Sequence, residues 1–131
     1  MHITKKVRGS CVLLAGLLTA PIVAHAAAGD LDVNFDGDGR VITDFGGDDY
    51  ANAVARQSNG RIVVAGLHND FNVSANSGFA LARYRRDGQL DTSFSGDGRV
   101  VTPLGGTAVA HAVVIQLDDR IIAGGYVDAT S

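Results

Sequence analysis

The chain has 131 residues, of which 17 are glycine and only two are proline. This length suits one ordinary domain, and the glycine content disfavours long helices. One cysteine excludes a disulfide scaffold and a cysteine-based zinc site. All 14 acidic residues are aspartate, and the only lysines are Lys5 and Lys6.

The N-terminus has the pattern of an export signal. Lys5, Lys6 and Arg8 precede an apolar run over residues 11–20, and Ala24-His25-Ala26 follows as a small-x-small cleavage site. The apolar run is too short to serve as a transmembrane anchor. We therefore expect a signal peptide over residues 1–26, a short leader over residues 27–30, and no transmembrane anchor after cleavage.

Cleavage after Ala26 leaves 131 − 26 = 105 residues, with eight arginines against 14 aspartates. The resulting net charge of −6 excludes an electrostatic surface for nucleic acid or anionic membranes. The lack of any remaining cysteine suits an oxidising compartment. We expect a periplasmic, cell-surface or extracellular protein.

A repeat organises the rest of the chain. Residues 31–72 align without a gap on residues 90–131, at an offset of 59, with 18 identities in 42 positions. The repeat predicts a first unit over residues 31–89 and a second, truncated unit over residues 90–131.

Each complete unit is expected to hold four short strands. Strand-like patterns cover residues 40–43, 51–56, 61–66 and 79–84, and Gln57–Gly60 has the composition of a hairpin turn. Four antiparallel strands make one sheet, which cannot bury both faces alone, so stacked sheets are expected. The expected core residues are Ile62, Val64, Phe79 and Leu81, with Ile121 in the role of Ile62.

The motifs resemble those of a known family. Leu31–Val41 has the form L-D-x-x-F-x-G-D-G-R-V, residues 57–66 read Q-x-x-G-R-I-V-V-A-G, and residues 79–91 read F-A-L-A-R-Y-x-x-D-G-x-L-D. Together they are similar to the delta-60 repeat family of bacterial exported proteins. The resemblance implies an all-β, incomplete β-propeller-like architecture of about one and two-thirds repeats, and it implies no reaction.

The second hairpin departs from the pattern, because Asp119 stands where the first unit has Gly60. Aspartate adopts a left-handed conformation less readily than glycine. The sequence therefore leaves the register of this hairpin open.

The start of the first unit matches half of a calcium loop. Asp32, Asn34 and Asp36 follow the spacing D-x-[DN]-x-[DN]-G, but Thr43 stands where a bidentate acid is expected. In the second unit the corresponding side chains are those of Asp91, Ser93 and Ser95. A calcium site and a purely structural turn between blades are the two interpretations.

The Gly-Asp-Gly turns around Asp38 and Asp97 lack the following helix and the lysine of a phosphate-binding loop. We expect these aspartates to accept hydrogen bonds from turn amides or to pair with Arg40 and Arg99.

Polar positions that differ between the two units are candidates for binding. They are expected in loops between strands, where binding residues concentrate on a rigid scaffold, and they are Asp48, Asp49, Tyr50, His68, Asn69 and Asp70. Simple loop variation is the alternative.

No nucleophile motif or histidine pair with metal-ligand spacing occurs after residue 26, and no cofactor is indicated beyond the calcium interpretation. The favoured hypothesis is an exported, non-enzymatic repeat module that serves structure, binding or the cell surface. The alternatives are a fragment of a propeller hydrolase, such as a lactonase or a phosphotriesterase-like enzyme, and a small calcium-binding module. The partner is unknown, and self-association or pairing with further repeats is expected because a truncated unit leaves an open strand edge.

Overall fold

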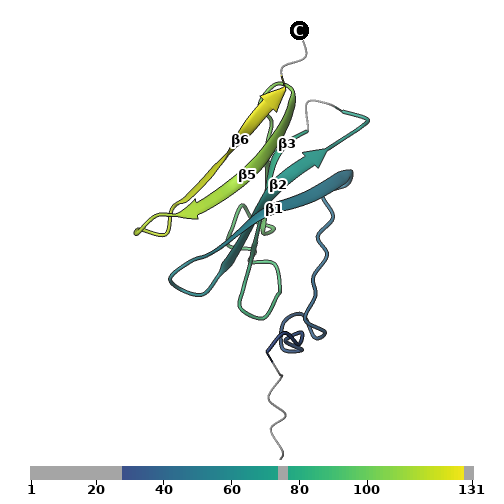
Figure 1. Cartoon of the computed structure of the whole chain (residues 1–131). Coiled ribbons are helices and arrows are strands. Elements are labelled where there is room, and N and C mark those ends of the chain that lie inside the picture. Colours follow the sequence, from purple (N-terminus) through teal and green to yellow (C-terminus); the bar gives the residue numbers. More distant parts are fainter. Residues whose placement is uncertain (1–27, 74–76, 129–131) are drawn as a thin grey trace, which may run out of the picture. The chain divides into compact units, whose positions relative to one another are not determined.

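A computed structural model describes residues 28–73 and 77–128 (Figure 1). The fold described below is that of the unit that begins at Leu31. The expected signal peptide, residues 1–26, lies outside the described residues. The described residues contain no helix long and apolar enough to span a membrane.

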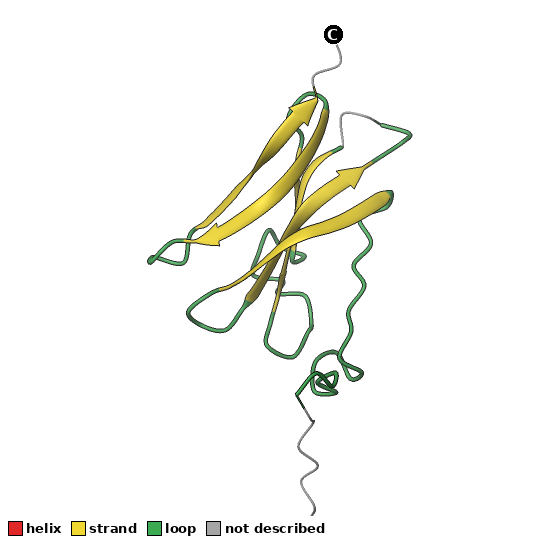
Figure 2. Ribbon diagram, viewed as in Figure 1, coloured by secondary structure: helices red, strands yellow, loops and turns green. Residues whose placement is uncertain are grey.

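The described part of the chain is all-β, as the sequence predicts (Figure 2). Its strands form a first sheet of four and a second sheet of two, and all pairings are antiparallel. The first sheet has the order β1-β2-β3-β4. The strand bounds are β1 Asp48–Arg56, β2 Ile62–Asn69, β3 Gly78–Tyr84, β4 Arg99–Thr102, β5 Thr107–Ile115 and β6 Ile121–Asp128.

The first sheet crosses the boundary that the repeat predicts between residues 89 and 90. Its fourth strand, β4, belongs to the second unit and pairs with β3 from Phe79↔Thr102 to Ala82↔Arg99. The prediction of a strand over residues 40–43 is wrong, because these residues lie outside every strand. They are the counterpart of β4, and such a segment becomes a strand only beside the third strand of a preceding sheet.

The two hairpins are copies of each other. Arg56 pairs with Ile62 at the first turn and Ile115 with Ile121 at the second, and each hairpin has a register shift at the same place, Ala51/Ala53 and Ala110/Ala112. Asp119 adopts a φ of 62°, close to the 85° of Gly60. The register that the sequence left open is therefore the same in both units.

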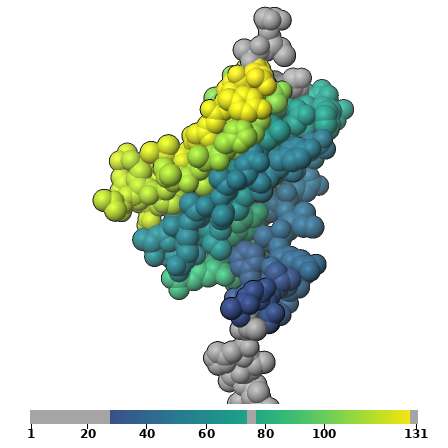
Figure 3. Space-filling model, in the orientation of Figure 1, coloured from purple at the N-terminus to yellow at the C-terminus, as the bar shows by residue number. Residues whose placement is uncertain are grey.

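The core lies between the two sheets, where β5 contacts β1, β2 and β3. On the surface in Figure 3, the yellow-green second hairpin lies directly beside the teal strands of the first sheet, whose arrangement Figure 1 labels. Its buried residues are Val63, Ala65, Leu81 and Ala110. Leu81 confirms the sequence expectation, and Phe79 packs against this core while partly buried. On β2, however, the core-facing residues are Val63 and Ala65 instead of the expected Ile62 and Val64.

The error in β2 has a simple cause. Every position from Ile62 to Leu67 is apolar or glycine, so alternation does not show which side chains face the core. The packing of the second sheet decides it. Ile121 packs against the core cluster whereas Ile62 is absent from it, so the two isoleucines do not share one role.

Candidate functional site

The two groups of polar candidate residues meet at one end of the first sheet, which we call the polar end. The start of β1 pairs with the end of β2 through Asp48↔Asn69, Asp49↔His68 and Tyr50↔Leu67. The prediction that these residues lie in loops is wrong for all but Asp70, because the two strands extend further than the sequence pattern indicates. Cross-strand pairing therefore joins residues that the sequence separates by about 20 positions.

His68 and Asp49 form the centre of the polar end. His68 Nδ1 lies 2.7 Å from Asp49 Oδ1, and the two side chains are 5% and 18% exposed. The other carboxylate oxygen of Asp49 accepts a hydrogen bond from the Phe45 backbone N–H at 2.8 Å. The Phe45 ring lies 5.9 Å from the imidazole, centre to centre. The carboxylate thus orients the imidazole and fixes the segment that precedes β1.

Asn69 and Asp70 organise the connection that leaves β2. Asp70 Oδ1 accepts hydrogen bonds from the backbone N–H groups of Asn72 and Val73, at 2.9 and 3.1 Å. The Ser77 hydroxyl accepts the Asp70 N–H at 2.8 Å and lies 3.2 Å from Asn69 Oδ1. Asp48 and Tyr50 are exposed and remain accessible to a ligand.

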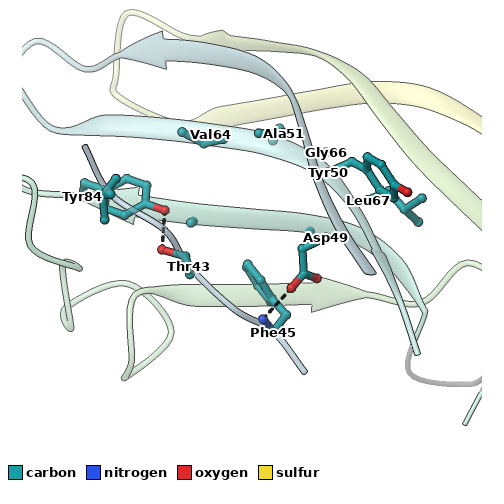
Figure 4. A pocket seen from close by; sticks show the side chains of 13 residues that line it. Thr43, Phe45, Asp49, Tyr50, Ala51, Val64, Gly66, Leu67 and Tyr84 are labelled. Carbon is teal, nitrogen blue, oxygen red and sulfur yellow. Dashed lines mark hydrogen bonds between the residues drawn. The ribbon is translucent and has the colours of Figure 1, made fainter. Parts of the chain in front are cut away.

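A pocket of about 210 Å³ opens beside the polar end, on the face of the first sheet that is opposite the second sheet. One wall is the segment from Val41 to Phe45, and the floor includes Val64, Ala82 and other small side chains of β2 and β3 (Figure 4). Thr43 Oγ1 and the Tyr84 hydroxyl are 2.6 Å apart across the pocket. The pocket is mainly apolar, and its polar side chains are this hydroxyl pair, the Asp49 carboxylate and Tyr50. It therefore suits a small apolar group that carries a hydrogen-bonding end.

The calcium-loop residues form a compact turn. Asp32 Oδ1 accepts hydrogen bonds from both the backbone and the side-chain amide of Asn34, each at 3.0 Å. Asp36 has a φ of 51°, and its carboxylate accepts a hydrogen bond from the Gln89 amide. The described residues hold no cluster of three or more His, Cys, Asp or Glu side chains that could bind a metal. A calcium ion here needs backbone or amide oxygens in addition to these two carboxylates, and the calcium site stays a prediction.

The second unit builds the same turn with different side chains. Ser93 replaces Asn34 and donates its hydroxyl to Asp91 Oδ1 at 2.7 Å, and Ser95 has a φ of 55° where Asp36 has 51°. In both copies a glycine lies close to the start of the turn. A Cβ added to Gly98 would lie only 2.9 Å from the Cβ of Leu90, and the φ of Gly98 is 87°. The shared geometry explains why glycine recurs at this position of the motif.

Asp91 is the charged centre of this second turn, and sequence reasoning named it only as the counterpart of Asp32 in the calcium-loop pattern. Its side chain is 6% exposed and accepts hydrogen bonds from Arg61 Nε at 2.5 Å and Arg83 Nε at 2.9 Å. The Ser93 hydroxyl, with further help from the Ser93 N–H and the two arginines, lowers the pKa of Asp91 to about 2 against the effect of burial. One feature of the sequence could have indicated a role for Asp91: both the aspartate and the arginine recur in the two units, as Asp32 with Asp91 and Arg61 with Arg120.

The two Gly-Asp-Gly aspartates cap turns, as the sequence predicts. Asp38 and Asp97 each accept the backbone N–H two residues later, at 2.9 Å, from Arg40 and Arg99. The Arg99 N–H, followed by the Arg99 side chain, lowers the pKa of the Asp97 carboxyl. The Arg99 guanidinium also donates to the Asp44 carbonyl at 2.6 Å.

The two hairpin turns are tied together, which sequence reasoning missed. Asp119 accepts hydrogen bonds from the Ser58 N–H at 3.0 Å and the Ser58 hydroxyl at 2.7 Å. These bonds, the hydroxyl first, lower the pKa of the Asp119 carboxyl. The Gln57 amide donates to the Asp119 carbonyl at 2.8 Å, and the Asn52 amide donates to the Ala110 carbonyl at 3.0 Å.

Comparison with known protein families gives one match. Residues 57–94 match the model of a beta-propeller domain of unknown function, DUF5122. The matched stretch runs from the first hairpin turn through β2 and β3 to the turn that contains Asp91 and Phe94. The comparisons with curated proteins and with solved structures found no match. The similarity is therefore to a repeat family of the beta-propeller kind.

Proposed function

We propose that the chain is an exported, non-enzymatic repeat module of the delta-60 type, whose role is to stack blade-like sheets and to present their ends to a partner. The observation that carries the proposal is the use made of the repeated residues. They set the turns and the register of both hairpins.

The contacts between the sheets support this interpretation. The second hairpin packs on the first through small side chains at the interface, and hydrogen bonds join Asn52, Gln57 and Ser58 to the second unit. Each of these bonds links residues about 60 positions apart, which is close to the repeat length. Such contacts between successive units are the basis of stability in repeat proteins.

The polar end is the surface at which the module is proposed to meet a partner. Its residues differ between the units: Asp49 and His68 correspond to Ala108 and Val127. Because the scaffold is satisfied with an apolar pair at these positions in the second unit, the polar pair is not required for the fold of a blade. Export is the other part of the proposal, and it rests on the N-terminal sequence alone.

A series of chains with one, two or three further copies of residues 31–89 inserted directly before Leu31, in register with the repeat, tests the stacking role. Chemical denaturation is followed for each, with the unextended chain as reference. We expect the free energy of unfolding to rise with each added unit, because every unit adds an interface. Added units that unfold separately, with an unchanged midpoint for the original chain, would contradict the proposal.

A further inference from the structure

The edge of β6 lacks the neighbour that its counterpart has. β6 is the repeat counterpart of β2, at the offset of 59. β2 pairs with β1 on one side and with β3 on the other, whereas among the described residues β6 pairs with β5 alone. An unpaired edge presents backbone N–H and C=O groups to an incoming strand.

A groove of about 490 Å³ lies beside this edge, between β6 and the β3–β4 side of the first sheet, and we call it the strand groove. It adjoins the core, since Leu81, Ile121 and Ala123 belong both to the groove and to the core packing. Its lining is apolar except for one hydroxyl and consists of Phe79, Leu81, Phe94, Val100, Thr102, Leu104, Ile121 and Ala123.

The repeat identifies what fills the corresponding place in the first unit. Three residues of the groove, Val100, Thr102 and Leu104, are the counterparts of Val41, Thr43 and Phe45. In the first unit these three lie over the face of β3 that carries Ala80, Ala82 and Tyr84. Thr43 contacts the Tyr84 hydroxyl there, at 2.6 Å (Figure 4). The strand groove is thus a second copy of a site that β3 occupies in the first unit.

We propose that the β6 edge and the strand groove bind an extended polypeptide segment of the β3 type. The segment adds antiparallel to β6, with small, small and aromatic side chains at alternate positions directed toward Val100 and Thr102. A tyrosine at the third of these positions hydrogen-bonds the Thr102 hydroxyl. The natural source is another repeat of this kind, so the inference rests on the proposed function and specifies how the module joins further repeats.

The probe is a synthetic peptide with the sequence of residues 77–89, titrated into the full chain by calorimetry. We expect saturable one-to-one binding, a higher melting temperature, and slower amide exchange over Ile121–Asp128. The matched control is the same peptide with A82P, which lacks one backbone N–H and disfavours an extended pairing strand. Equal binding of both peptides, or no binding of either, would overturn the proposal.

A double-mutant cycle tests the hydroxyl pair. T102V in the chain keeps the shape of the side chain and removes its hydroxyl, and Y84F in the peptide removes the other. Each single change is expected to weaken binding by about 3- to 10-fold, the value of one hydrogen bond, and the double change is expected to cost little more. Two results would overturn the assignment: a peptide affinity that T102V leaves unchanged, or protection from amide exchange that is confined to β2 and β4. Either would show that the peptide exchanges with a strand of the first sheet instead of binding beside β6.

A chain extended after Ser131 by the sequence of residues 73–89 provides a second measurement. The added strand belongs to the same chain and should occupy the groove, raise the melting temperature and abolish peptide binding. The same extension with A82P should have none of these effects. If chains extended by whole units are stabilised while the peptide and this extension have no effect, the strand groove fails and the stacking role stands.

Discussion

At the scale of single residues, the Asp91 side chain makes a large contribution to the stability of the fold. It is the repeat counterpart of Asp32 but, unlike that residue, it is buried. It is held by Arg61, which immediately precedes β2, and by Arg83 of β3. The chain therefore uses the first residues of its second unit to fasten the sheet of the first. Loss of this carboxylate should loosen β2, β3 and the following turn together.

Asp91→Asn is expected to lower the free energy of unfolding at neutral pH by about 1.5–3 kcal/mol, the range for hydrogen bonds to charged groups. The pKa of Asp91 is lowered from 3.8 to about 2, so its stabilising effect is complete above pH 3.8 and is lost as the pH falls toward 2. The variant should lack this part of the acid destabilisation. Urea denaturation between pH 2 and pH 7 measures both effects.

The control is Asp87→Asn, because Asp87 also lies beside an arginine but its side chain is 58% exposed. It should change stability by less than about 0.5 kcal/mol. Identical pH profiles for wild type and Asp91→Asn would show that the buried carboxylate does not carry this linkage.

The Asp49–His68 pair is predicted to be energetically coupled. Asp49→Ala leaves a nearly buried imidazole without its carboxylate partner, and His68→Val leaves the Asp49 carboxylate with the Phe45 N–H as its remaining donor. The double variant recreates the Ala108↔Val127 pair of the second unit. It should therefore be less destabilised than the sum of the two single variants, by about 0.5–3 kcal/mol. Additive free energies in the four-member urea cycle would contradict this coupling.

At the scale of elements, β2 is the strand whose two faces are used differently. Val63 and Ala65 face the second sheet and are fully buried, whereas Val64 lines the pocket on the opposite face. The same division recurs in β6, where Ile121 and Ala123 pack toward the core and Ile122 is 49% exposed. The outer face of β6 is therefore the counterpart of the face of β2 that the second sheet covers.

Val63→Ala should lower the free energy of unfolding by about 1.5–3 kcal/mol, because two buried methyl groups are lost and a cavity remains. The matched control is Val54→Ala on β1, where the same change is made at a side chain that is 67% exposed. This control should stay within about 0.5 kcal/mol of wild type. Equal shifts of the two denaturation midpoints would show that the core has been assigned to the wrong face of the sheet.

At the scale of the whole molecule, the two faces of the first sheet are covered by different parts of the chain. The first sheet contributes a core face to the second sheet, and its opposite face is lined by the segment that is the counterpart of β4. The arrangement is that of a stack in which each sheet rests on the one before it. The match to a beta-propeller family model, over residues 57–94, includes the boundary between the two units.

Processing of the N-terminus is predicted at the same scale. Material recovered outside the cytoplasm should begin at Ala27, because Ala24-His25-Ala26 completes the signal pattern. N-terminal sequencing of the exported protein measures this directly. A variant with A24L and A26L should accumulate uncleaved, since small residues are required at these two positions. An exported wild-type chain that retains Met1 would refute the prediction.

The sequence determined much of this protein by itself. The 59-residue offset, the turn residues and the short apolar runs were sufficient for an all-β fold of stacked antiparallel sheets and for both hairpins. These features are local, or they are repeated within the chain, and a period or a turn residue reports them directly. The capping roles of Asp38 and Asp97 were predictable for the same reason.

The tertiary structure decided which residues face one another. Residues 40–43 and 99–102 have nearly the same sequence, yet only the second segment forms a strand, because only it lies beside a third strand. The choice of Val63 over Ile62 for the core depends on the sheet that packs above β2. The meeting of Asp49 with His68, and of Asp91 with its two arginines, depends on pairings between distant segments. Pairings of this kind are set by the packing of whole sheets, and no local pattern in the chain encodes them.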